Sequence, residues 1–167
     1  MLGDFGTLVA RSAVGLSLAA HGTQKALGWF EGPGPAGAAG FMESLGFRPG
    51  DRYAALSSYT ELASGLLITL GLGGPLGPAM LVSVMVVAQT SVHAKNGYFA
   101  TKNGVELGVL YIAAAVLLGS SGYGRFSLDR ALNFSALDDE RLAWATLLGG
   151  AAAGAVALGQ REAGEAT

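Results

Sequence analysis

Long apolar runs alternate with short polar or glycine-rich connections along the chain. Crossing the hydrocarbon of a bilayer takes about 20 mostly apolar residues. Four segments approach that length, over about residues 5–29, 53–72, 75–93 and 104–118. A fifth candidate, rich in Ala and Gly, covers about residues 141–159 and either spans or lies at the interface. The pattern predicts an all-α integral membrane four-helix bundle with an additional C-terminal fifth helix.

The connections indicate how these helices are joined. The stretch "GLGGPLGP" between the second and third segments is typical of a tight turn. After the first segment, Pro35 suits the first position of a helix and Gly46 its end, so we expect a short interfacial helix there. Asp51 is the predicted N-cap of the second long helix. Ser127 or Asp129 is expected to begin another interfacial helix.

The chain divides into a transmembrane bundle over residues 1–130 and a C-terminal extension over residues 131–167, with the fifth helix and a polar tail. No Lys or Arg precedes the first apolar segment, and Asp4 is acidic, so no secretory signal is predicted and the first helix is expected to be retained. The pairs Gly104/Gly108 and Gly150/Gly154 have GxxxG spacing, which favours close helix packing. In a chain with 27 glycines, chance explains such spacing equally well.

Composition narrows the function classes. Of 167 residues, 51% are hydrophobic and 13% are charged, whereas soluble domains have about 25% charged residues. We therefore expect lipid to cover much of the surface. The net charge of −2 argues against a nucleic-acid partner. The chain has no cysteine, which excludes disulfides, thiolate nucleophiles and cysteine-ligated clusters.

Ionisable residues lie inside the predicted spans, where a charge costs about 2.5–3.5 kcal/mol at the helix centre. We call the membrane side that holds the N-terminus side A and the opposite side B. His21 and Glu61 come from adjacent antiparallel helices, and both are predicted about 12 Å below the side-B boundary. Lys25 lies one turn shallower on the face of His21. The third and fourth segments bring further polar side chains toward side B: Gln89, His93 and Glu106. The sequence thus predicts a polar cavity in the side-B half.

Each of these residues also has a structural explanation. Lys25 would snorkel to the interface, Glu106 would favour a helix N-terminus, and His93 would be an interfacial cap. A pair of Glu61 with His21 or Lys25 would only fix packing.

Other polar and aromatic residues have simpler predicted roles. Arg11, near side A, is expected to snorkel. Trp29, Phe30 and Trp144 are interpreted as interfacial aromatic residues. No ExxH or HxxxH pattern occurs, so no metal site is predicted.

Four stretches carry a family resemblance: "HGTQKALGWFEGPGPAGAAGFMESLGF" (21–47), "ELASGLLITLGL" (61–72), "HAKNGYF" (93–99) and "GYGRFSLD" (122–129). They resemble the DoxX family of small prokaryotic membrane proteins. The resemblance implies a four-helix, multi-pass protein of the plasma membrane, so the fifth helix departs from the usual pattern. Relatives act as a subunit of thiosulfate:quinone oxidoreductase or accompany oxidoreductases in detoxification complexes. The resemblance assigns a polar role to six residues: His21, Lys25, Glu61, His93, Asn96 and Glu106.

Three functions stay open. The first is an accessory subunit of a membrane oxidoreductase, with no cofactor of its own, whose pocket binds a quinone head group. In it, His21 or Lys25 would donate hydrogen bonds and Glu61 would handle protons, and electron transfer would need a protein partner or the bound quinone. The second is a non-catalytic anchor for a partner complex, and the third is a small-solute transporter component. A homo-oligomer is compatible with all three. The candidate pocket comprises His21, Lys25, Glu61, Gln89, His93, Asn96 and Glu106.

Overall fold

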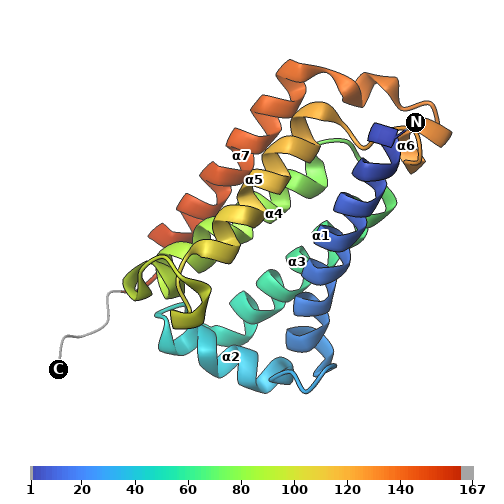
Figure 1. Cartoon of the computed structure of the whole chain (residues 1–167). Coiled ribbons are helices and arrows are strands. Elements are labelled where there is room, and N and C mark those ends of the chain that lie inside the picture. Colours follow the sequence, from blue (N-terminus) through green and yellow to red (C-terminus); the bar gives the residue numbers. More distant parts are fainter. Residues whose placement is uncertain (1, 163–167) are drawn as a thin grey trace.

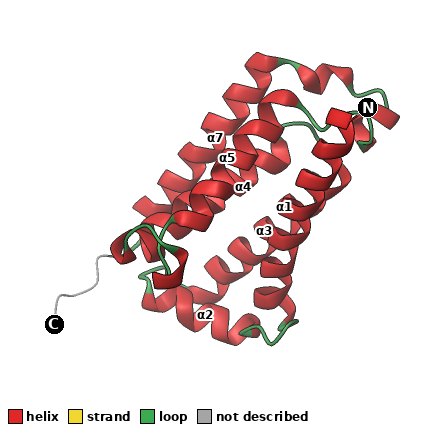
Figure 2. Ribbon diagram, viewed as in Figure 1, coloured by secondary structure: helices red, strands yellow, loops and turns green. Residues whose placement is uncertain are grey.

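Helices make up the regular secondary structure of this computed structural model, which describes residues 2–162, and no strand occurs in that range (Figure 2). The end of the predicted polar tail, residues 163–167, lies outside the described residues. The long helices are α1 (Leu2–Leu27), α3 (Gly50–Leu70), α4 (Leu76–Ala88), α5 (Glu106–Ser121) and α7 (Glu140–Gly159). The short elements are α2 (Gly34–Ser44), η1 (Gln89–His93), η2 (Ala94–Asn96), η3 (Ala100–Lys102), α6 (Leu128–Ala131) and η4 (Ser135–Asp138). The all-α prediction is confirmed for this part of the chain.

The long helices run side by side and alternate in direction, so each end of the molecule collects a set of connections (Figure 1). We call the end with Leu2, the α3–α4 turn and α6 end A. The opposite end, with α2 and η1 to η3, is end B. These ends correspond to the predicted sides A and B.

Glycines let α1 and α3 approach closely. A Cβ added at Gly22 would lie 2.7 Å from both the carbonyl oxygen of Ser58 and the backbone nitrogen of Leu62, so no larger residue fits there without a shift. Small residues at a helix contact bring the backbones together. This contact sets the register of the pair and brings Lys25 on α1 level with Glu61 on α3.

A second small-residue contact joins α7 to α4. A Cβ at Gly150 would clash with the backbone of Ala79, and one at Gly154 would lie 2.7 Å from the carbonyl oxygen of Ser83. The Gly150/Gly154 pair therefore lies in a helix–helix contact. Gly108 packs against the Gln89 side chain instead.

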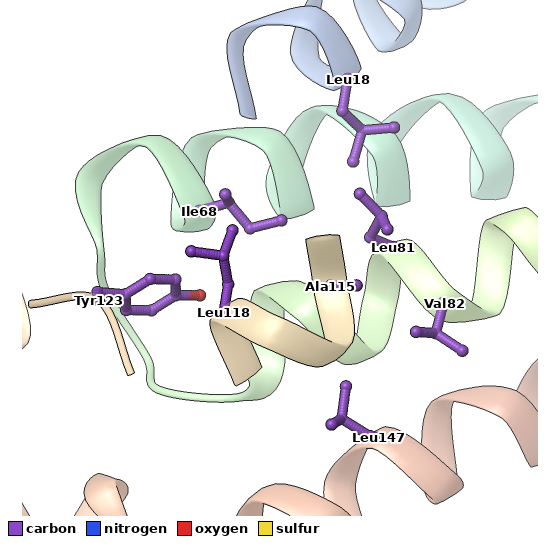
Figure 3. Packing of buried hydrophobic residues seen from close by; sticks show 8 residues of the cluster. All are labelled: Leu18, Ile68, Leu81, Val82, Ala115, Leu118, Tyr123 and Leu147. Carbon is purple, nitrogen blue, oxygen red and sulfur yellow. The ribbon is translucent and has the colours of Figure 1, made fainter. Parts of the chain in front are cut away.

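One hydrophobic cluster connects the long helices (Figure 3). Its members are Leu18 of α1, Ile68 of α3, Leu81 and Val82 of α4, Ala115 and Leu118 of α5, Tyr123, and Leu147 of α7. Because Leu147 is 4% exposed in this cluster, α7 shares the core of the helices that precede it.

Two helical stretches in the described residues are long and apolar enough to cross a membrane, judged by length and composition. They are Leu76–Asn96 and Glu140–Gly159, with mean hydropathies of 1.4 and 1.6. α5 is a shorter apolar helix, and α1 and α3 do not meet the same criterion. Only 17% of the α7 window is buried, whereas the core helix of a soluble protein is mostly buried. Large apolar side chains face outward on several helices, including Leu16, Leu66, Leu110, Leu117 and Leu148.

Arg11 does not snorkel, so that expectation is wrong. Its side chain is buried, and its guanidinium donates to the carbonyl oxygens of Ile68 and Thr69 and, at 2.5 Å, of Phe126. The last carbonyls of a helix have no partner within that helix, and a guanidinium has five donors to offer. Arg11 therefore closes the end of α3 and holds the connection after α5 against it.

Asp129 joins α6 to the α3–α4 turn at end A. Its two carboxylate oxygens accept hydrogen bonds from the backbone N–H groups of Gly73 and Gly74, at 2.8 and 2.7 Å. Ser127 is the N-cap of α6, since its hydroxyl accepts from the Arg130 N–H at 3.2 Å, so Ser127 begins the predicted helix. Nearby, burial raises the pKa of Tyr123.

The helix boundaries differ from the predictions in two places. Pro49, not Asp51, is the N-cap of α3, and Asp51 lies in the first turn, where its carboxylate accepts from the Arg52 N–H at 2.8 Å. The third predicted helix does not continue as an α-helix to His93, because η1 is a π-helix. Pro35 is in the first turn of α2 and Gly46 follows its end with a φ of 87°, as predicted.

Candidate functional site

A cavity of about 530 Å³ opens at end B between α2, α3, α4, η1 and α7. Much of its wall is apolar and includes Phe41, Phe47, Leu56, Val84 and Val87. The wall also contains nine residues with polar groups: Lys25, Tyr53, Ser57, Thr60, Glu61, Ser83, Ser91, His93 and Asn103. Ligand sites are usually apolar hollows of about 300–1,000 Å³ with a few placed polar groups, so both the size and the lining suit a small molecule.

An ion pair lies on the α1–α3 side of this cavity. Lys25 Nζ is 2.5 Å from Glu61 Oε1. The Glu61 side chain is 7% exposed and that of Lys25 is 27% exposed. The pair forms because Gly22 lets the two helices approach and Lys25 reaches across the contact. An ionised carboxylate this deep requires such a partner.

Two buried polar atoms at the cavity have no hydrogen-bond partner in the described structure. They are Oε2 of Glu61, the second oxygen of the paired carboxylate, and Oγ of Ser91. An unsatisfied buried polar group costs about 1–3 kcal/mol, and such groups call for an explanation. Here both residues line the same hollow, which suggests that a ligand completes their hydrogen bonding.

The π-helix η1 carries two of the polar residues. Single π-helical turns occur frequently at functional sites, and η1 contains Ser91 and His93. Nδ1 of His93 lies 2.8 Å from the carbonyl oxygen of Asn103. A carbonyl only accepts, so Nδ1 carries a hydrogen in this contact. The ring is thus oriented by Asn103, the residue that follows η3.

The structure brings three of the seven predicted residues to the cavity: Lys25, Glu61 and His93. His21 is exposed on the outside of α1 and does not line the cavity. Lys25, one turn further along α1, is the residue that pairs with Glu61.

The other three predicted residues do not line the cavity. The amide of Gln89 packs against Gly108 on α5, and its buried Oε1 has no hydrogen-bond partner in the described structure. Asn96 donates to the carbonyl oxygens of Val92 and Asn103, each at 3.1 Å. Glu106 accepts from the Ala100 N–H at 2.8 Å and so closes the loop before α5.

Sequence reasoning missed Ser91, Thr60 and the contribution of α7. Ser91 lies in the π-helix η1, where the period of 3.6 residues no longer tells which side chains share a face. Ala153 and Ala157 of α7 line the cavity from the opposite side. Their i, i+4 spacing, beside the Gly150/Gly154 pair, was the available signal.

Residues 160–162, which follow α7, contact the α2–α3 connection and the start of α3. The Glu162 N–H donates to the Gly46 carbonyl oxygen at 2.9 Å, and the Tyr53 hydroxyl donates to Gln160 at 3.0 Å. The guanidinium of Arg161 lies 5.5 Å from the ring centre of Phe47. Since Phe47 and Tyr53 line the cavity, these contacts hold its mouth in shape.

Within residues 2–162, no group of three or more His, Asp or Glu side chains gathers in a way that would hold a metal ion. The arrangement offers a carboxylate, an ammonium group, an imidazole and hydroxyls around an apolar hollow. Such a site can orient an amphipathic molecule and exchange protons with its polar end.

Comparison with known proteins agrees with the resemblance. The family model of DoxX matches residues 6–94, more than half of the chain. No curated protein and no solved structure matches. The matched part runs from α1 into η2 and contains Lys25, Glu61, Ser91 and His93. The chain therefore belongs to the DoxX family.

Proposed function

We propose that this protein is a multi-pass subunit of the prokaryotic plasma membrane, associated with a redox system, whose end-B cavity binds a lipid-soluble ligand of the quinone class. The observation that carries the proposal is the cavity itself: an apolar hollow of about 530 Å³ with the Lys25–Glu61 pair and His93 on its wall.

Several features support membrane insertion. DoxX proteins are membrane proteins that are often associated with oxidoreductases. In the proposed arrangement α1, α3, α4 and α5 form a four-helix membrane bundle, and α7 is a fifth span. Ionisable residues within membranes are usually paired and face the interior of the protein. Glu61 and Lys25 meet this condition through their ion pair, and Arg11 meets it through its bonds to carbonyl oxygens.

The lining favours a quinone-class head group. A ring with two polar oxygens presents flat apolar faces to side chains such as Phe41 and Val87, and its long tail leaves toward lipid. Lys25 donates to an oxygen of the ring, and Glu61 accepts or supplies a proton. The chain has no cysteine and hence no thiol redox centre. Electrons would therefore pass between the bound ligand and a protein partner in the same membrane complex.

The test is extraction of the protein in a mild detergent, followed by mass spectrometry of the lipids and proteins that accompany it. We expect the wild type to retain quinone, and Ala157→Phe, which fills the cavity, to lower the quinone-to-protein ratio at least about tenfold. Ala155→Phe is the matched control, because Ala155 is exposed on α7 and does not line the cavity. Quinone-free wild-type protein, or equal loss in both variants, would contradict the proposal.

A second function, a non-catalytic anchor, is favoured by the exposed aromatic residues of end B. Trp29 packs edge-on against Phe30, and Tyr98 against Phe99, while all four side chains remain exposed. Such side chains suit a docked partner. An anchor would keep its complex fully active when Glu61 is changed to Gln, whereas a ligand-binding subunit would not.

A further inference from the structure

We propose that the end-B cavity selects the reduced, hydroxyl-bearing form of its ligand, so that a hydroquinone binds more tightly than the corresponding quinone. This inference rests on the proposed function and specifies which form of the ligand the site recognises. It follows from the acceptors that the protein leaves unsatisfied at the cavity.

Glu61 is the central acceptor. The carboxylate is paired with Lys25 and is therefore ionised, and an ionised carboxylate only accepts hydrogen bonds. Oε1 receives the Lys25 ammonium, whereas Oε2 is buried without a donor. A quinone carries two carbonyl oxygens and has no hydrogen to offer. A hydroquinone carries two O–H groups, and hydrogen bonds from O–H to a carboxylate are among the strongest in proteins.

Small side-chain movements bring these groups into contact with a ligand. Oε2 of Glu61 is buried, so its contact with a ligand requires the carboxylate to rotate about its terminal torsion, which is broad and soft in Glu. The hydroxyl of Ser91 also lacks a partner and rotates freely. Because Ser91 both donates and accepts, it complements a ligand hydroxyl as well as a carbonyl.

His93 adds to the same preference whenever its ring is neutral. Its Nδ1 is occupied by the Asn103 carbonyl, so Nε2 is then an acceptor. Lys25 is a donor on the same wall, but its side chain is 27% exposed and can satisfy its other N–H groups with water. Of the two buried atoms at the cavity that lack partners, Oε2 of the Glu61 carboxylate can only accept, whereas Oγ of Ser91 can donate or accept. A ligand that donates can therefore satisfy both atoms, and this sets the direction of selection.

Binding of three probes to the purified wild-type protein tests the proposal. The probes are 2-decyl-1,4-hydroquinone, the matching quinone, and the dimethyl ether of the hydroquinone, which keeps the shape but has no O–H. Titrations are followed by calorimetry without oxygen. We expect the hydroquinone to bind at least about tenfold more tightly than either other probe. Decanol is a fourth probe, and binding as tight as that of the hydroquinone would show that any lipid hydroxyl suffices and would overturn the quinol assignment.

The variant Glu61→Gln provides the internal check. Its amide offers N–H donors, so we expect the preference to fall or to reverse in favour of the quinone. Glu31→Gln, at an exposed position outside the cavity, is the control and retains the wild-type preference. If Glu61→Gln does not fold, the comparison of the hydroquinone, the quinone and the dimethyl ether on the wild type still decides the proposal.

The outcomes separate the two proposals. Equal binding of hydroquinone and quinone, or tighter binding of the quinone, overturns the proposed preference for the hydroquinone. The proposal that the cavity binds a quinone-class ligand is not affected by that result. Absence of binding by any ring-bearing probe overturns the proposed function itself. If folded Glu61→Gln keeps the wild-type preference for the hydroquinone, the Glu61 carboxylate does not recognise the ligand hydroxyl, and the inference fails.

Discussion

At the scale of single residues, the buried charges of this protein separate into structural and ligand-facing groups. Arg11 donates hydrogen bonds to carbonyl oxygens at end A, and Asp129 accepts hydrogen bonds from two backbone N–H groups there. Glu61 uses one oxygen for Lys25 and leaves the other without a partner beside a cavity. A buried group with spare hydrogen-bonding capacity next to a hollow is the better candidate for ligand binding.

The ion pair leads to a stability prediction. Lys25→Met leaves the buried Glu61 carboxylate without its ammonium and is expected to lower the free energy of unfolding by about 1–3 kcal/mol, less than for a fully buried pair because Lys25 is partly exposed. Thermal unfolding in detergent measures this loss.

The double variant Lys25→Met with Glu61→Met should recover most of the stability, because no unpaired charge remains. Lys95→Met, at an exposed lysine of end B, is the control and should stay within about 0.5 kcal/mol of the wild type. A double variant less stable than Lys25→Met alone would argue against the pairing.

At the scale of elements, glycine contacts decide which helices touch. Gly22 places α1 on α3, and Gly150 with Gly154 places α7 on α4. The α7 contact has a functional consequence, since it carries Ala153 and Ala157 to the cavity wall. The site proposed here is therefore incomplete without the C-terminal helix, even though the family match ends at residue 94.

Adjacent glycines of α7 allow a matched test of this contact. Gly150→Ala is expected to destabilise the protein, because its Cβ would clash with the backbone of Ala79. Gly149→Ala has open space around its Cβ and should be neutral or stabilise by up to about 1 kcal/mol through helix propensity. Thermal unfolding of both variants in detergent measures the difference. Equal effects would mean that α7 does not pack on α4 in this register.

At the scale of the whole molecule, the two ends have different chemistry. End A is held together by Arg11, Ser127 and Asp129. End B holds the cavity, the π-helix and the exposed aromatic pairs. If the helices cross the membrane as proposed, these ends face opposite compartments. The ligand and the protein partner then both bind in the end-B half of the molecule.

Single cysteines test this topology, since the natural chain has none to give background. Arg125→Cys and Arg141→Cys place a thiol at end A, and Lys102→Cys and Gly159→Cys place one at end B. We expect a membrane-impermeant maleimide to label one pair in intact cells and the other only after permeabilisation. Gly159 also reports on α7, because it should behave like Lys102. Labelling of all four sites in intact cells would contradict a multi-pass arrangement.

Sequence pattern alone was enough for the helices, their order and much of their extent, because apolar runs and Gly/Pro connections are local features. It also singled out Lys25, Glu61 and His93, which line the cavity, because charged or ionisable residues stand out in apolar segments. His21, expected in the same pocket, is exposed on α1 and outside the lining, and Arg11, expected to snorkel, is buried. Depth along a helix follows from residue count, but the reach of a side chain and the partners it meets depend on the neighbouring helix.

Local patterns along the chain were sufficient to predict helices, to place ionisable residues inside them and to indicate the family. The folded protein was needed to show that Lys25 rather than His21 pairs with Glu61, that Asn96 and Glu106 bind nearby backbone groups, and that Ser91 and α7 line the cavity. These outcomes depend on helix register, on glycine contacts and on a local π-helix. Each is settled by packing between segments far apart in the chain rather than by any local pattern.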